Sequence, residues 1–90
     1  MRRRIAAAAL MAALLAGCDA GIEDSTPIGV DKVPAKVMDV AKSKLPGVTF
    51  EKAWTGKSGG EVAYEVRGTN ENGKTREIRI SASGKVLEME

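Results

Sequence analysis

The hydrophobic and polar positions between Tyr64 and Ile80 form the most regular pattern in the chain. Tyr64 and Val66 alternate with charged residues before a polar cluster, and Ile78 and Ile80 alternate with charged residues after it. An alternation with a period of two is typical of strands that bury one face. The polar cluster at 70–73 has the composition of a turn. The pattern therefore predicts a β-hairpin.

The turn decides the register of this hairpin. A two-residue Asn72-Gly73 loop would place Arg67 opposite Ile78, which mixes charged and apolar side chains on one face. A three-residue loop with Gly73 in the left-handed conformation separates the two kinds of side chain. It also creates two cross-strand pairs of opposite charge, each contributing about 0.2 to 1 kcal/mol. The predicted pairs are Tyr64 with Ile80, Glu65 with Arg79, Val66 with Ile78 and Arg67 with Glu77.

A short amphipathic helix is predicted over Pro34–Lys44. Pro34 suits the first position of a helix, and the residue before a proline leaves helical geometry. Pro46 and Gly47 close the other end. One face carries apolar residues at helical spacing and needs a covering surface. These residues are Val37, Val40, Ala41 and Leu45, with Met38 at the edge.

A strand is predicted over Val48–Trp54, with Val48, Phe50 and Trp54 on its apolar face. Lys52 interrupts that face. Three glycines between residues 55 and 60 then favour a flexible loop before the hairpin.

The last predicted strand is Lys85–Glu90. A two-residue Ser83-Gly84 turn would bring Leu87 opposite Ile80. The same turn would place Met89 opposite Ile78.

The expected fold class is α+β, with one short amphipathic helix packed on a four-stranded antiparallel meander sheet. Its outer face should be polar and open to water. The expected core is Val37, Val40, Ala41, Leu45, Val48, Phe50, Trp54, Val62, Tyr64, Val66, Ile78, Ile80, Leu87 and Met89. The expected outer face is Thr49, Glu51, Ala53, Ala63, Glu65, Arg67, Glu77 and Arg79.

Residues 1–17 have the composition of a signal peptide. A basic start precedes the apolar run Ile5–Leu15, which falls short of the roughly 20 residues that span a bilayer. The string Leu15-Ala16-Gly17-Cys18 resembles the lipobox of bacterial lipoproteins. This resemblance implies that Cys18 carries diacylglycerol and, after cleavage, an N-acyl chain, an anchor that holds a small domain at a membrane. The alternative is an ordinary secretory signal followed by a free thiol.

Residues 18–31 are acidic and broken by glycine and proline, which predicts a flexible tether before a domain at 32–90. Asp19 resembles the inner-membrane retention signal of some bacterial lipoproteins. The expected location is therefore the bacterial envelope on the periplasmic side, with a slight preference for the inner membrane; the alternative for Asp19 is one more acid in the linker.

Charge and composition exclude several function classes. The chain has 14 Lys and Arg against 12 Asp and Glu, and loss of residues 1–17 removes three arginines. The remainder has no basic stripe for nucleic acid. It contains no histidine, so a Ser-His-Asp or Cys-His catalytic group is absent, as is a His/Cys metal cluster. We expect no enzyme and no cofactor.

The candidate binding residues are Trp54, Glu65, Arg67, Glu77 and Arg79. Aromatic and arginine side chains are favoured at interface hot spots, although Trp54 also suits a core position. Glu65 and Glu77 share this face and could in principle act as an acid–base pair. We expect the arginine opposite each glutamate to keep it ionised instead. Solvated ion pairs are the alternative role for these four charged residues, and Tyr64 is expected in the core.

Residues 32–90 resemble the PepSY-like domains. The resemblance rests on Val33-Pro34-Ala35, the helix that ends in Leu45-Pro46-Gly47, Tyr64-Glu65-Val66, Asn72-Gly73-Lys74, Glu77-Ile78 and Gly84-Lys85-Val86-Leu87. Such domains are similar in layout to the repeats of β-lactamase inhibitor proteins. The resemblance implies a membrane-anchored, non-catalytic module that binds an exported protein, with a peptidase inhibitor or modulator as one form of that role. The alternative is a sensor that binds a small molecule or cation.

Overall fold

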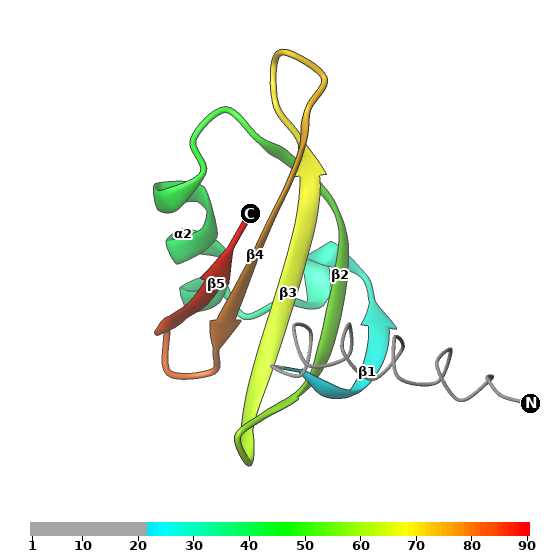
Figure 1. Ribbon diagram of the computed structural model, residues 1–90, viewed down its shortest axis with the longest axis vertical. Coiled ribbons are helices and arrows are strands. Elements are labelled where there is room, and N and C mark those ends of the chain that lie inside the picture. Colours follow the sequence, from blue (N-terminus) through cyan, green and yellow to red (C-terminus); the bar gives the residue numbers. More distant parts are fainter. Residues whose placement is uncertain (1–21) are drawn as a thin grey trace, which may run out of the picture.

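Five antiparallel strands form one sheet whose spatial order follows the sequence, and an α-helix lies against one face of it (Figure 1). The computed structural model describes residues 22–90. This α+β architecture confirms the predicted fold class, with five strands in place of four. The strands are β1 Glu23–Ile28, β2 Thr49–Ser58, β3 Glu61–Thr69, β4 Thr75–Ser81 and β5 Val86–Met89. The 3₁₀ helix η1 covers Val30–Lys32, and α2 covers Ala35–Lys44.

The hairpin of β3 and β4 has the predicted register. All four expected pairs are present, including Val66 with Ile78 and Arg67 with Glu77. Gly73 has a φ of 80°, which is the left-handed conformation that the three-residue loop requires. The Asn70 side chain strengthens the turn, because its oxygen accepts hydrogen bonds of 2.9 Å from the backbone N–H groups of Asn72 and Lys74.

The hairpin of β4 and β5 has the same kind of turn, so the predicted two-residue Ser83-Gly84 turn is wrong. The backbone N–H of Ser81 donates to the carbonyl of Lys85 at 2.9 Å, which closes a three-residue loop. Gly84 takes the left-handed position with a φ of 97°. The Ser81 hydroxyl accepts a hydrogen bond from the Lys85 N–H, as the Asn70 side chain does in the first turn.

The longer loop shifts the start of β5. Val86 lies opposite Ile80, so the predicted pairing of Leu87 with Ile80 is wrong. The register shifts within β5 and then places Met89 opposite Ile78, as predicted. The extra residue returns Met89 to the apolar side of the sheet.

A bulge in β2 corrects the predicted faces of that strand. Phe50 pairs with Gly68 and Lys52 pairs with Arg67, so one residue of β2 is left over between them. Beyond the bulge the alternation is reversed, and Ala53 is buried in the core at 3% exposure while Trp54 lies opposite Glu65. The prediction that Trp54 is a core residue and Ala53 an outer-face residue is therefore wrong.

Strand β1 occupies a part of the chain that was expected to be a flexible tether. It pairs with the second half of β2, from Glu23 opposite Lys57 to Ile28 opposite Ala53. Almost all of its residues are exposed, and it carries Pro27, which an edge strand tolerates. The expected tether is therefore wrong for residues 23–31. The predicted signal peptide, Cys18 and Asp19 lie outside the described residues.

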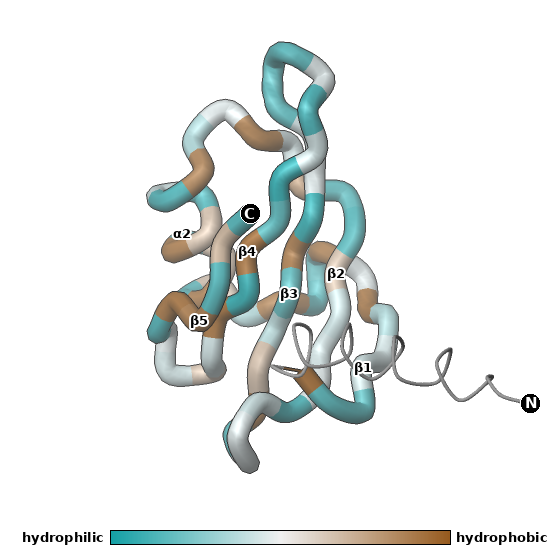
Figure 2. Tube along the Cα trace, viewed as in Figure 1, coloured by the Kyte–Doolittle hydropathy of each residue, from teal (hydrophilic) through white to brown (hydrophobic). Residues whose placement is uncertain are grey.

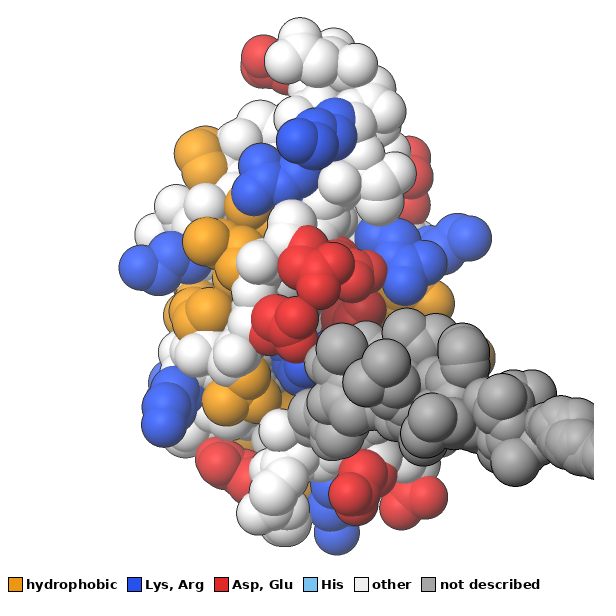
Figure 3. All heavy atoms as spheres, in the orientation of Figure 1, with side chains coloured by type: hydrophobic (Ala, Val, Ile, Leu, Met, Phe, Trp, Pro, Cys, Tyr) orange, Lys and Arg blue, Asp and Glu red, His pale blue; other side chains and the backbone are white. Residues whose placement is uncertain are grey.

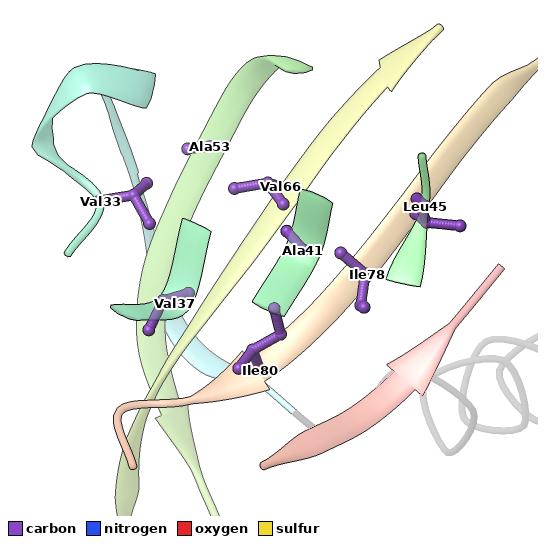
Figure 4. Close-up of a cluster of buried hydrophobic side chains, with 8 residues drawn as sticks. All are labelled: Val33, Val37, Ala41, Leu45, Ala53, Val66, Ile78 and Ile80. Carbon is purple, nitrogen blue, oxygen red and sulfur yellow. The ribbon is translucent and has the colours of Figure 1, made fainter. Parts of the chain in front are cut away.

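The core lies between α2 and the middle of the sheet (Figure 4). The helix begins at Ala35, one residue after the predicted start, with Pro34 at the capping position. Figure 2 shows apolar and polar residues alternating along β4, the strand that this helix contacts. The buried cluster is Val33, Val37, Ala41, Leu45, Ala53, Val66, Ile78 and Ile80.

Three residues expected in the core are exposed instead. Val62 is 40% exposed near the turn of the β2–β3 hairpin, although it pairs with Lys57 and its carbonyl accepts a hydrogen bond from the Ala82 N–H. The hairpin itself extends beyond the other strands in Figure 1. Leu87 and Met89 are 37% and 46% exposed, since β5 is an edge strand and α2 lies mainly over β4. Within residues 22–90, no helix has the length and hydropathy needed to cross a bilayer.

Candidate functional site

The sheet face opposite the helix carries a connected network of ion pairs, which we call the outer-face network. Arg67 Nε donates a 2.9 Å hydrogen bond to Glu77 Oε1, and Arg79 Nη1 donates one of 2.6 Å to Glu88 Oε1. Glu65 lies between the two arginines, 3.8 Å from a nitrogen of each. Figure 3 shows acidic side chains gathered over the middle of the visible face, with basic side chains around them. Three carboxylates therefore share two guanidinium groups.

Trp54 extends this network onto β2. The guanidinium carbon of Arg67 lies 4.6 Å from the centroid of the Trp54 ring, a cation–π geometry. The Arg67 side chain is still 41% exposed, so one side of its planar guanidinium remains accessible to a partner. The pair thus presents an aromatic ring and an arginine at the surface, the residue types that dominate interface energetics.

Glu65 is the buried carboxylate of the network. Its side chain is 13% exposed. Burial raises the pKa of the Glu65 carboxyl above its usual 4.5, and the nearby charge of Glu77 and a hydrogen bond with it raise it further. Arg79 and Arg67 act in the opposite direction. The facing arginines therefore lower the pKa of Glu65, as expected, but desolvation and Glu77 outweigh them and the net shift is upward.

Arg79 is the least exposed cation of the network. It is 8% exposed, and its Nε has no hydrogen-bond partner among the described residues. Its other nitrogens contact Glu65 and Glu88. A buried cation held by two carboxylates fixes the position of both and ties β4 to β3 and β5. Arg79 therefore has a structural role in this face, because little of its side chain is accessible to a ligand.

A groove of about 690 Å³ lies on the helix side of the sheet, where η1, α2 and the start of β2 meet. Its floor is apolar and its rim is charged. The floor includes Val30, Val33, Met38, Val48 and Phe50. The rim includes Asp31, Asp39 and Lys42. This volume lies within the range of small-ligand pockets.

The structure brings all five sequence-predicted site residues together on one face. Trp54 joins Glu65, Arg67, Glu77 and Arg79 there only because the bulge in β2 turns its ring outward. Their role in binding stays a prediction. Ala53 and Ala63, expected on the same surface, are buried at 3% and 0% exposure.

Sequence reasoning missed Glu88 and the groove. Glu88 had a usable signal, because the predicted pairing of Met89 with Ile78 already places it opposite Arg79. The groove had none, since it depends on how far α2 lies from the start of β2. Within residues 22–90, no group of three His, Cys, Asp or Glu residues is arranged to hold a metal ion.

No protein-family model, curated protein or solved structure matches this chain.

Proposed function

We propose that this chain is a membrane-anchored, non-catalytic protein-binding module of the bacterial envelope that acts on an exported protein. A peptidase that it inhibits or modulates is the partner class implied by the PepSY-like resemblance. The lipobox-like string that ends at Cys18 supports the anchor. The carboxylates of the outer-face network are engaged by arginines, which suits recognition better than proton transfer.

The observation that carries the proposal is the Trp54–Arg67 pair. Trp54 is half-buried on a sheet face that α2 leaves open, and Arg67 lies 4.6 Å from its ring with much of its side chain in water. Arg67 is held by its 2.9 Å hydrogen bond to Glu77, and its guanidinium packs against the Trp54 ring. A partner would therefore meet an ordered aromatic–arginine surface and would lose little conformational freedom in ordering it.

Capture from the envelope tests the binding role. The full chain, extracted with detergent from the bacterium that produces it, should retain a specific exported protein. Arg67→Ala should weaken this capture, because it removes the exposed cation and uncovers the Trp54 ring. Lys57→Ala is the matched control, since Lys57 is an exposed cation further along β2. Equal capture by both variants, or no retained protein at all, would count against the proposal.

Fractionation tests the anchor separately. Cys18→Ala should move the chain from the membrane to the soluble fraction, because the acyl chains have no other attachment point. Continued membrane association of this variant would refute the lipid anchor and leave the binding role open.

The groove favours a second candidate function, a sensor for a small molecule. Its volume of about 690 Å³ and its mixed apolar and charged lining suit an amphipathic ligand. A panel of small metabolites and divalent cations, screened for a shift in the melting temperature of the full chain without any partner protein, distinguishes the two functions. A ligand that raises this temperature would favour the sensor.

A further inference from the structure

The start of β2 has a free backbone edge. β1 pairs with β2 only as far as Ala53 and then leaves the sheet through Gly29 into η1, which contacts β2 without pairing with it as a strand. On the opposite side, β3 pairs with β2 down to Thr49. Among the described residues, Thr49–Lys52 therefore have a strand on one side only. Three of these four residues are exposed. Such an edge presents unpaired N–H and C=O groups that another extended chain can bond.

This free edge borders the groove. The groove runs between α2 and the start of β2, and its lining includes Val48, Thr49 and Phe50. A strand added beside Thr49–Lys52 would point alternate side chains to the two faces of the sheet. One set would enter the groove, whose floor is apolar. The other set would face a hollow of about 270 Å³ on the surface that includes Lys52 and Arg67.

The rim of the groove indicates the charge of the occupant. Asp31 and Asp39 both line it, and neither has an ion-pair partner within 4.0 Å among residues 22–90. Lys42 is the single cation of the lining, so the rim has an excess of negative charge. A basic side chain would meet two carboxylates there, whereas an acidic one would meet one lysine.

We propose that the free edge of β2 over Thr49–Lys52 receives an extended segment of a partner protein, with an apolar side chain in the groove and a lysine or arginine at Asp31 and Asp39. The segment adds a strand to the sheet beside the start of β2, on the side opposite β3. This inference rests on the proposed protein-binding function and names the kind of segment that is bound. Main-chain hydrogen bonds to β2 supply affinity, and the groove selects the side chain.

Two other occupants fit less well. A second copy of this chain, paired through the same edge, would bring two acidic rims together, which opposes association. A small molecule would fill the groove and leave the backbone groups of Thr49–Lys52 unbonded. An extended polypeptide satisfies both the groove and the edge.

A random decapeptide library displayed on phage, selected against the full chain in detergent micelles, tests the inference. Selected peptides should have aliphatic or aromatic residues at every second position, as in a strand with one apolar face. They should also carry a lysine or arginine close to these residues. Their binding should slow amide hydrogen exchange at Thr49–Lys52, because a strand addition protects the edge amides. Asp31→Lys with Asp39→Lys should weaken binding about tenfold, since two attractive contacts become repulsive.

The matched control is Glu23→Lys with Glu61→Lys, which makes the same change in net charge at two exposed carboxylates away from the groove. This control should bind the peptides as the unchanged protein does. Peptides whose binding is lost with Arg67→Ala but kept with the Asp31 and Asp39 reversal would overturn the inference and leave the proposed function standing. No selected peptide, or protection of the same amides by self-association or by a small ligand, would also overturn it. If the unchanged protein neither binds selected peptides nor captures a partner from the envelope, the proposed function fails as well.

Discussion

Ile78 allows a direct measurement of how much the helix–sheet core stabilises the fold. Its side chain is 1% exposed and lies opposite Val66 in the middle of the sheet. Ile78→Ala removes three carbon atoms, each worth about 0.8 kcal/mol of transfer free energy, and leaves a cavity between rigid elements. The expected loss is about 2 to 5 kcal/mol in the free energy of unfolding. A domain of this size is stable by only about 3 to 10 kcal/mol in total.

Urea denaturation followed by Trp54 fluorescence measures this loss. With a slope near 1 kcal/mol per molar, typical of a small domain in urea, the midpoint should fall by about 2 to 5 M. Val62→Ala is the matched control, because Val62 is another apolar residue of the sheet but is 40% exposed. It should cost less than about 1 kcal/mol. Equal midpoints for the two variants would refute the assignment of Ile78 to the core.

Three further predictions concern the outer-face network and the β3–β4 turn. The raised pKa of Glu65 means that the folded state binds its proton more tightly than the unfolded state, so this contribution to stability is present below pH 4.5 and is lost as pH rises through the raised pKa. As pH rises from 4 to 7, the urea midpoint of the unchanged protein should therefore fall relative to the midpoint of Glu65→Gln. A difference between the two midpoints that does not change with pH would contradict this. Arg79→Ala should lower the free energy of unfolding by roughly 2 to 5 kcal/mol, because it leaves Glu65 and Glu88 with one cation fewer. Arg67→Ala should lower it by about 1 kcal/mol or less, because the Arg67 side chain is 41% exposed. Equal losses in thermal or urea unfolding would show that burial does not distinguish the two arginines. Gly73→Ala should cost about 1 to 2 kcal/mol through its φ of 80° alone, because no atom lies within 4 Å of the added Cβ. Gly73→Asn should recover part of that loss in the same unfolding assay, and equal losses would argue against backbone strain as the cause.

The parts of the fold that the sequence predicted are those where two independent signals agree. In the β3–β4 hairpin, the apolar pairs and the opposite charges of Arg67 and Glu77 require one register, and the structure has it. The helix boundaries were similarly specified by Pro34 at one end and Pro46 at the other. Local chemistry of this kind is visible without knowing the tertiary packing.

The parts that were mispredicted depend on the position of neighbouring elements. β1 has no alternating pattern, because an exposed edge strand has no buried face to mark. In β2, Lys52 on an otherwise apolar face was the sign of a bulge, and taking it as a mere interruption placed Trp54 on the wrong side. The groove is visible only once α2 is positioned over β4, which no single segment of sequence specifies.

The order of the strands has a consequence for how the sheet comes apart. β2 through β5 are joined by short hairpin loops, but β1 reaches β2 only after η1 and the whole of α2, so its pairing closes the longest loop in the sheet. Because β1 also buries little side-chain surface, we expect it to detach first when the protein is heated or pulled from its N-terminus. Detachment would bare β2 along its whole length, so a pull on the N-terminus would lengthen the edge that we propose as the site of strand addition.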